Sequence, residues 1–432
     1  MLNKTYNAII AYIKDIIKDT IFENNVFSVG GCERDFIIGG KIKDVDLVIK
    51  SIPNGGVKFS MFLYENNYLC YEPVIYEHFG TAAFRLKQYP HIELEAVQTR
   101  KECYRDMESR NPETAFGTIM DDCHRRDFTV NAIYRNISTG EVLDLNGNSF
   151  KDIENGIIRT CGDPNVIFSE DPLRILRAIR FKYRLDYQYD TETLNGMFKY
   201  TDRLSIISQE RITNEFSKIL CGNNAVEAID EMRNLDMLKY VFPIDENVIK
   251  NNILLLKNRM YLKTSKPNLI VRLAILFRGL EEWDIKGLVR AMKYPNDVAD
   301  DIIFLHKFTM DYRSYNDGNQ HFYLPNIRKA MYYSKTSDKF KLLTDYLEAI
   351  GRDGQAIYMT SIFEIGDIMY GYKLGVNGDD IMNAFGIKPG PQVKYLLGSL
   401  IESAFVFPEI YKKKDCCLMK IEGILNNAIE CY

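Results

Sequence analysis

The spacing of apolar residues along this chain changes near Gly162 and keeps its new period from there on. Before that point the apolar runs are short and strand-like, as in VFSVGG, DVDLVI, GTAAFRL and IELEAV. After it, apolar residues recur every three to four positions, as in ERITNEFSKIL and KFKLLTDYLEAI, which is the period of an amphipathic helix. Residues 2–23 show the same helical period. We therefore predict an α+β chain, in which an N-terminal sheet domain is followed by a long all-α region.

Composition and charge exclude several classes of protein. The 432 residues include 55 Lys and Arg against 59 Asp and Glu, and 46% are hydrophobic, which is typical of a globular protein. No apolar run is long enough to predict a membrane span, and no signal peptide is expected. Nine cysteines without a CxxC pair favour a reducing, cytoplasmic location over a disulfide or zinc scaffold. The formal charge of −4 argues against bulk coating of nucleic acid, although a local basic groove stays open.

A double glycine, Gly30-Gly31, follows the first predicted strand and precedes Arg34. Glycines at such a turn let the backbone approach a phosphate closely, and a helix that begins there offers N–H groups to an anion. A tight strand-to-helix turn with a surface arginine explains the same pattern equally well. The double glycine therefore indicates a phosphate site only in combination with other motifs.

Asp44 and Asp46 occupy positions i and i+2 of the next predicted strand, so both carboxylates point to the same face. Two such charges repel each other unless a cation lies between them, and Mg²⁺ prefers carboxylate oxygens. An isolated pair of this kind is more often solvated at a strand edge, but its place after the glycine turn favours a metal site. Glu95, which shares a face with Glu93, is either a third acid near the metal or part of a polar strand edge.

Four motifs resemble those of the class II tRNA nucleotidyltransferases and bacterial poly(A) polymerases: GGCERD, KDVDLVI, RRDFTVNAI at 125–133 and SEDPLRILRAIRF at 169–181. A later segment, residues 377–397, is similar to one near the C-terminus of the CCA-adding members. Glu33 departs from the family, which usually has a small or apolar residue there. The resemblance implies a polymerase-beta-like nucleotidyltransferase sheet domain followed by an all-α neck, body and tail.

The resemblance also implies a two-metal transfer of a nucleotide to RNA. Mg²⁺ ions on Asp44 and Asp46, with Glu95 nearby, would bind the triphosphate and activate the RNA 3′-hydroxyl, and attack on the α-phosphate would expel pyrophosphate. Positioning and charge would then supply most of the catalysis.

Five residues of the head motifs are expected to bind the nucleotide. They are Gly31 and Arg34 at the glycine turn, Arg126 and Asp127, which resemble residues that hold the sugar and phosphates, and Asn131, which caps or orients their turn. A buried Arg–Asp pair that pins a helix is the alternative interpretation for Arg125 or Asp127.

A polar stripe follows, in which Asp171, Arg174, Arg177 and Arg180 recur every three residues of a predicted helix. Pro172 suits the first helical position and makes Asp171 a candidate N-cap, but a cap does not explain three arginines. Cytosine and adenine present an acceptor ring nitrogen beside an amino donor, whereas guanine and uracil present the reverse. An aspartate that accepts and an arginine that donates therefore match C and A. We predict that Asp171 and Arg174 read the base and that Arg177 and Arg180 face phosphate or the stacked base.

Two stretches without acidic residues indicate where RNA could lie. Residues 174–184 contain five basic residues, and residues 250–278 contain seven. Surface helices usually mix charges, so these stretches favour contact with the RNA backbone. A solvated basic face without a partner is the alternative.

We therefore expect an enzyme that adds or repairs the 3′-terminal CCA of tRNA from CTP and ATP, with Mg²⁺ as cofactor and tRNA as partner. A poly(A) polymerase, or an enzyme that adds only CC or A, is the closest alternative, although FGTAAFRL follows the pattern of tRNA-type members. A catalytically inactive RNA-binding module and a toxin-type nucleotidyltransferase are more distant alternatives. No membrane and no protein partner are expected. The predicted domains are a catalytic head at 1–150, a base-reading neck at 151–220, an RNA-binding body at 221–330 and a tRNA-binding tail at 331–432.

Overall fold

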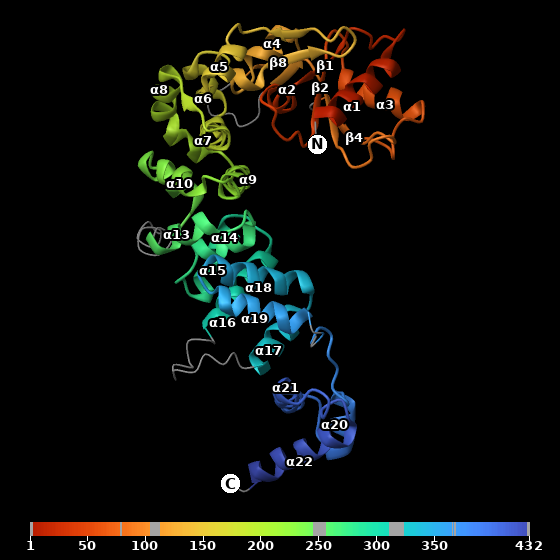
Figure 1. The fold of residues 1–432 in the computed structure, drawn as a ribbon, viewed down its shortest axis with the longest axis vertical. Coiled ribbons are helices and arrows are strands. Elements are labelled where there is room, and N and C mark those ends of the chain that lie inside the picture. Colours follow the sequence, from red (N-terminus) through yellow and green to blue (C-terminus); the bar gives the residue numbers. More distant parts are fainter. Residues whose placement is uncertain are drawn as a thin grey trace. The chain divides into compact units, whose positions relative to one another are not determined.

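The computed structural model of this protein describes residues 3–77, 80–103, 113–244, 256–310, 324–364, 366 and 369–429. The chain divides into two compact units, Met1–Pro243 and Ile244–Tyr432, each of which is described by itself (Figure 1). Within the described ranges, all strands belong to the first unit. None of the described helices is long and apolar enough to cross a membrane. The boundary between the units falls inside the range 221–330 that we assigned to the body.

The first unit is built on one mixed sheet. Among the described residues it has seven strands in the order β3-β4-β5-β2-β1-β8-β9. Strands β2 and β5 are parallel, and the other neighbours are antiparallel. The strands are β1 (Val26–Val29), β2 (Val45–Ile49), β3 (Val74–Tyr76), β4 (Thr81–Phe84), β5 (Leu94–Gln98), β8 (Ile133–Asn136) and β9 (Val142–Asp144). The four strands predicted from short apolar runs are thus confirmed as β1, β2, β4 and β5.

One face of this sheet is covered by α1 (Asn3–Ile17) and α3 (Gly55–Glu65). Their apolar side chains pack with Val45, Leu47 and Ile49, which share a face because side chains alternate along a strand. The helix predicted over residues 2–23 is confirmed in α1, although it ends at Ile17. Its buried residues are Tyr6, Ile9, Ile13, Ile16 and Ile17.

The opposite face of β1 and β2 is covered by a second apolar cluster, which includes Phe27, Val29, Val48, Cys123 and Tyr134. Cys123 belongs to α4 (Ile119–His124), and Tyr134 belongs to β8. Asp46 shares this face with Val48, because the two residues are two positions apart in β2. The sheet therefore directs its central aspartate toward α4 and the turn that follows it.

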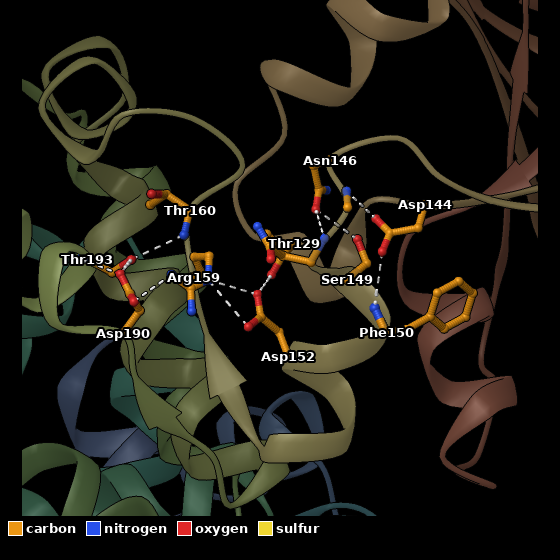
Figure 2. Close-up of polar contacts among 12 residues, drawn as sticks. Thr129, Asp144, Asn146, Ser149, Phe150, Asp152, Arg159, Thr160, Asp190 and Thr193 are labelled. Carbon is orange, nitrogen blue, oxygen red and sulfur yellow. Dashed lines mark hydrogen bonds and ion pairs between the residues drawn. The ribbon is translucent and has the colours of Figure 1, made fainter.

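A helical neck completes the first unit. Its start is joined to the head by polar contacts around Arg159, which Figure 2 shows. Nε of Arg159 donates to Asp152 at 3.1 Å, and Nη1 donates to Asp190 at 2.6 Å. Asp152 also accepts from Thr129 at 2.7 Å, and Thr129 begins the turn η2 (Thr129–Asn131) of the head. The helices of the neck are α5 (Ser149–Asn155), α6 (Pro164–Glu170), α7 (Leu173–Leu185), α8 (Thr191–Tyr200), η3 (Thr201–Ile206), α9 (Gln209–Leu220), α10 (Ala225–Asn234) and α11 (Leu238–Val241).

Small two-stranded sheets flank these elements. Strands β6 (Arg100–Cys103) and β7 (Glu113–Phe116) are antiparallel, and β10 (Ile157–Ile158) and β11 (Gln188–Tyr189) are parallel. The second of these sheets lies beyond residue 150, so the region that we predicted as all-α contains a short strand pair at its start. Two residues per strand are too few to produce a recognisable alternation in the sequence.

The second unit is helical throughout its described residues, as predicted. Its C-terminal helices enclose a separate apolar cluster with Ile381, Leu396 and Ile421. Trp283 of α15 is 74% exposed. The helices are α13 (Leu256–Thr264), α14 (Leu269–Leu276), α15 (Glu282–Ala291), α16 (Asn296–Met310), α17 (Leu324–Ser334), α18 (Ser337–Ala349), α19 (Asp353–Glu364), α20 (Gly378–Phe385), α21 (Pro391–Val406) and α22 (Lys414–Ile429).

The acid-free stretch at 250–278 does not form one exposed basic face in its described residues. Arg272 is 3% exposed and donates to the carbonyl oxygens of Lys266 and Ser265, so it is a structural residue. Lys266 is exposed, but its ammonium lies 2.5 Å from Asp345 and 3.1 Å from Glu348 of α18. Lys250 lies outside the described residues. Acids from a distant part of the chain therefore balance charges that the local sequence leaves unopposed.

Candidate active site

The predicted glycine turn joins β1 to α2 (Gly31–Ile37). Gly30 has φ 85° and ψ −139°, a conformation that glycine adopts readily and other residues do not. A Cβ built on Gly30 would lie 3.3 Å from Oδ2 of Asp46 and 3.6 Å from Nη1 of Arg126. The turn therefore brings backbone, a carboxylate and a guanidinium to one point, which a side chain at Gly30 would fill.

Arg34 is 1% exposed, so the interpretation of this position as a surface arginine is wrong. Its Nε and Nη2 donate to Oδ1 of Asp35 at 2.8 and 2.7 Å, and its Nη1 donates to Oδ1 of Asn131. Asn131 in turn donates through Nδ2 to Asp127 at 3.1 Å. Asn131 thereby connects the glycine turn with the RRDFTVNAI motif.

The three predicted acids lie close together. Asp44 directly precedes β2 and is exposed, whereas Asp46 lies within β2. Glu95 is the register partner of Asp46 on the parallel strand β5, so these two side chains project from the same face of the sheet. Burial and the charge of Asp44 raise the pKa of Asp46 to about 7, with a further contribution from Glu95, although Arg126 opposes the shift. Burial also raises the pKa of Glu95.

This arrangement fits a divalent cation that is shared with a substrate. A partly buried carboxylate whose pKa is raised by acidic neighbours is stabilised in its charged form by a nearby cation. In the part of the chain that the structure describes, no three His, Cys, Asp or Glu side chains are grouped as a complete metal site. Mg²⁺ commonly uses one or two carboxylates together with substrate phosphates, and Asp44 and Asp46 match that pattern.

Arg126 approaches the acids from the turn after α4. Its side chain is 16% exposed, and its Nε and Nη2 donate to Oδ2 of Asp122 at 3.1 and 3.0 Å. Nε also lies 2.9 Å from the hydroxyl of Tyr134. These contacts leave Nη1 on the side of Gly30 and Asp46.

Asp127 and Arg177 form an ion pair. Nε of Arg177 donates to Oδ2 of Asp127 at 2.8 Å, and Asp127 also accepts from the N–H of Phe128 at 2.8 Å. For Asp127 the structure thus has an ion pair that pins a helix, with Arg177 of α7 as the partner. Nε of Arg180 lies 2.8 Å from Glu215 of α9. All three stripe arginines therefore pair with carboxylates of the protein itself, since Nη1 of Arg174 also lies 3.8 Å from Glu170.

The backbone N–H of Arg174 donates to the carbonyl oxygen of Asp171 at 3.0 Å, but the side chains of both residues bind other groups. Oδ1 of Asp171 accepts from the N–H of Leu173 at 3.3 Å, a cap-like contact at the start of α7, and Oδ2 accepts from Nη2 of Arg211 at 2.8 Å. Arg174 is 7% exposed and donates to the carbonyl oxygens of Ile167 and Arg125 at 3.2 and 2.7 Å. The pair predicted to read the base thus sits at the N-terminal end of α7 with other partners.

A cleft of about 740 Å³ lies in the first unit. It brings together Gly31, Arg34 and Asp44 of the head with Arg180 and Arg184 of α7. Lys43 and Lys218 also line it. Asp171 and Arg174 are not among its lining residues. The structure therefore joins the glycine turn and one acid to Arg180, the last residue of the polar stripe, and leaves Asp171, Arg174 and Arg177 outside the residues that line the cleft.

Sequence reasoning missed Asp122, Arg211 and Glu215. Asp122 precedes Arg126 by four residues, and this helical spacing is the signal that could have found it. The departure at Glu33 has a structural explanation, because its buried carboxylate accepts from Tyr6, Ser28 and, at 3.0 Å, from Arg135. A carboxylate with these partners is tolerated where the family usually has a small or apolar residue.

Comparison with known proteins identifies the class. Residues 26–159 match the family model described as "Poly A polymerase head domain", and residues 186–247 match the one described as "Probable RNA and SrmB- binding site of polymerase A". The head sheet with its glycine turn and adjacent acids is thus that of a nucleotidyltransferase of the poly(A) polymerase type.

The relatives narrow this assignment. The chain resembles CCA-adding enzymes over almost its whole length. It is 24% identical over 417 residues to the CCA-adding enzyme of Ligilactobacillus salivarius, covering 96% of both chains. It is 26% identical over 403 residues to that of Lactococcus lactis subsp. cremoris, covering 92% of both. The crystal structure of the Bacillus stearothermophilus CCA-adding enzyme in complex with CTP shares the fold, with a TM-score of 0.70, 21% identity and coverage of 94% and 95%.

Proposed function

We propose that this protein is a template-independent tRNA nucleotidyltransferase that adds or repairs the 3′-terminal CCA of tRNA from CTP and ATP and releases pyrophosphate. The observation that carries the proposal is the cleft of about 740 Å³, in which Arg34, Asp44 and Arg180 line one space. This volume is typical of a small-ligand site. A phosphate turn and a carboxylate thus face a basic helix across it. The CCA-adding relatives support the choice of product.

Asp44 and Asp46 would hold Mg²⁺, with Glu95 beside them. Bound there, the metal supplies the charge that stabilises the triphosphate and lowers the pKa of the attacking RNA 3′-hydroxyl. Arg126, whose Nη1 lies beside Asp46, adds a fixed positive charge at the same place. The Gly30-Gly31 backbone would approach a phosphate closely, because neither residue has a side chain. The chain's own part in the reaction is therefore to position the phosphates and to balance their charge.

We assign base choice to Asp171 and Arg174. Asp171 offers an acceptor to the amino group of cytosine or adenine, and Arg174 offers a donor to the ring nitrogen. Oδ2 of Asp171 accepts from Arg211 in this structure, so the amino group of the base would take the place of that guanidinium. A guanine or uracil carbonyl would instead leave a buried acceptor without a donor, at a cost of about 1–3 kcal/mol.

The reaction would take place in the cytoplasm, where tRNA is the substrate. A poly(A) polymerase, or an enzyme that adds only CC or A, could use the same head residues. The sequence FGTAAFRL, which contains β4, lacks the basic run of poly(A) members. It therefore favours a tRNA-type enzyme over a poly(A) polymerase.

The test is to incubate the protein and Mg²⁺ with a tRNA that ends at its discriminator base. CTP, ATP, GTP and UTP are supplied singly and together, and the products are sequenced. Addition of C, C and A in order, with no incorporation of G or U, is the expected result. Addition of A alone or of long A tails would overturn the proposal.

A further inference from the structure

Asp122 of α4 is a buried carboxylate at the centre of a charge cluster. Its side chain is fully buried, and it contacts two guanidinium groups and one phenol. Oδ1 accepts from Nε of Arg125 at 3.0 Å and from Nη2 of the same residue. Oδ2 accepts from Nε and Nη2 of Arg126 and from the hydroxyl of Tyr134, the last at 2.8 Å. Both oxygens of Asp122 are therefore engaged by groups of the RRD motif and of β8.

The cluster fixes the direction of the Arg126 side chain. Nε and Nη2 form one edge of the planar guanidinium, and both donate to the same oxygen, Oδ2 of Asp122. The Arg126 guanidinium carbon lies 5.3 Å from the centre of the Tyr134 ring, so its plane is supported as well as its edge. Nη1 lies away from that edge, 3.6 Å from the point where a Cβ on Gly30 would be. Oδ2 of Asp46 lies 3.3 Å from the same point.

Packing makes this orientation hard to change. Tyr134 is fully buried in the apolar cluster that covers this face of the sheet, and its ring is held with Phe27 and Cys123. Burial alone would raise the pKa of Asp122, but Arg126 and Arg125 hold that pKa below its usual range. The carboxylate is thus charged at neutral pH, and moving Arg126 would leave it with only one guanidinium in a dry environment.

We infer that Asp122 and Tyr134 are positioning residues that direct Nη1 of Arg126 at the nucleotide phosphates beside Asp46. This inference rests on the proposed function, because it takes Arg126 as a phosphate-binding group. Neither residue touches the cleft itself. Asp122 also fixes Arg125, whose carbonyl oxygen accepts from Arg174 at 2.7 Å. The buried carboxylate of Asp122 therefore fixes both Arg126, which faces Asp46 in the head, and Arg125, which contacts Arg174 in the neck.

The experiment measures steady-state addition of C and of A by four variants: Asp122→Asn, Tyr134→Phe, Arg126→Ala and the double variant Asp122→Asn/Arg126→Ala. Asp121→Asn is the matched control, because Asp121 is the half-buried neighbour of Asp122 and belongs to the capping box of α4 with Thr118. Arg126→Ala is expected to raise KM for CTP and ATP by tenfold or more, from the loss of charge-assisted hydrogen bonds. Asp122→Asn should raise both KM values by a similar factor, and Asp121→Asn should not change them.

The double variant separates positioning from general damage. If Asp122 acts through Arg126, the double variant is no worse than Arg126→Ala alone. Partial unfolding would instead lower kcat with KM unchanged, and independent effects would multiply; either result overturns the inference. Tyr134→Phe keeps the ring and removes only the hydroxyl, so a smaller rise in KM is expected even if Asp122→Asn fails to fold. An unchanged KM in Arg126→Ala would defeat the proposed phosphate role of Arg126. If Arg126→Ala raises KM but neither Asp122→Asn nor Tyr134→Phe does, only this inference is defeated.

Discussion

Nε of Arg177 donates to Oδ2 of Asp127 over 2.8 Å, and this bond joins the neck helix α7 to the RRDFTVNAI motif of the head. Asp127 is 8% exposed and also accepts from Asn131, which accepts in turn from Arg34. The glycine turn, the RRD motif and the stripe helix thus share one chain of polar contacts. A substitution of Asp127, at the centre of this chain of contacts, should therefore lower the stability of the first unit.

Asp127→Asn should lower the free energy of unfolding at neutral pH by roughly 1.5–3 kcal/mol, the value of a hydrogen bond to a charged group. The loss should depend on pH. Burial alone would raise the pKa of Asp127, but Arg177, Asn131 and the Phe128 N–H hold it well below its usual range. A depressed folded-state pKa gives stability that is present above the unfolded pKa of about 4 and is lost as pH falls below it.

Denaturant unfolding of both proteins between pH 7 and pH 3 checks this prediction. The difference in the free energy of unfolding between the unsubstituted protein and Asp127→Asn should shrink as the pH falls below about 4. Protonation of Asp127 then removes the stabilisation that its charge provides. A difference that stays constant over this range would contradict the ion pair as its source.

Asp44→Ala should abolish the addition of every nucleotide while tRNA binding stays nearly intact. Asp44 is exposed and lines the cleft, so its removal disturbs no packed residue. Transfer is measured with labelled CTP and ATP, and binding is measured by filter retention of tRNA. Residual turnover above a few per cent would contradict the assignment of Asp44 to the metal.

Glu95→Gln should reduce transfer more than Glu93→Gln. Glu95 is in register with Asp46, whereas Glu93 precedes β5 and lies 3.2 Å from Arg85 at the surface. The two substitutions are chemically identical, so the comparison isolates position. Equal rates for both variants, measured at several Mg²⁺ concentrations, would place Glu95 on a polar strand edge without a role in the reaction.

Asp171→Ala should relax base choice before it abolishes transfer, because the acceptor for the amino group of C or A is lost. The ratio of kcat/KM for CTP over UTP, and for ATP over GTP, should fall by about tenfold or more, the equivalent of a buried polar mismatch. Arg211→Ala frees Oδ2 of Asp171 from its present partner and should lower KM for CTP and ATP. Unchanged discrimination in Asp171→Ala would remove this residue from base reading.

Gly30→Ala should destabilise the first unit by about 1–3 kcal/mol, because φ 85° with ψ −139° is open to glycine alone. The new methyl group would also press on Asp46 at 3.3 Å, so activity should fall as well. Gly287→Ala is the control, since Gly287 lies within α15 with open space around it and alanine favours a helix. Thermal unfolding should show opposite shifts for the two variants.

Much of the fold could be predicted from the sequence. Local patterns were sufficient for β1, β2, β4, β5 and α1, because each strand or helix buries a face whose period is visible in the residues. The strand pair β10 and β11 was missed because two residues per strand carry no period. The partition into four domains remains a prediction.

The members of the candidate site stay a prediction from the sequence, and the contacts among them could be predicted less well. The glycine turn and Asp46 meet as expected, because the order of motifs reflects adjacent strands of one sheet. The partners of Arg34, Arg174 and Arg177 come from segments up to 97 residues away, and no local spacing reports such pairs. For the same reason, residues 250–278 looked uniformly basic, although Lys266 is balanced by acids of α18.

The chain contains one tryptophan, and it is the exposed Trp283 of the second unit. Indole fluorescence therefore reports on the surroundings of α15. An exposed indole responds to whatever covers it, so a tRNA titration followed at this wavelength monitors RNA contact with the second unit. The molecule thus carries its own optical probe of the second unit.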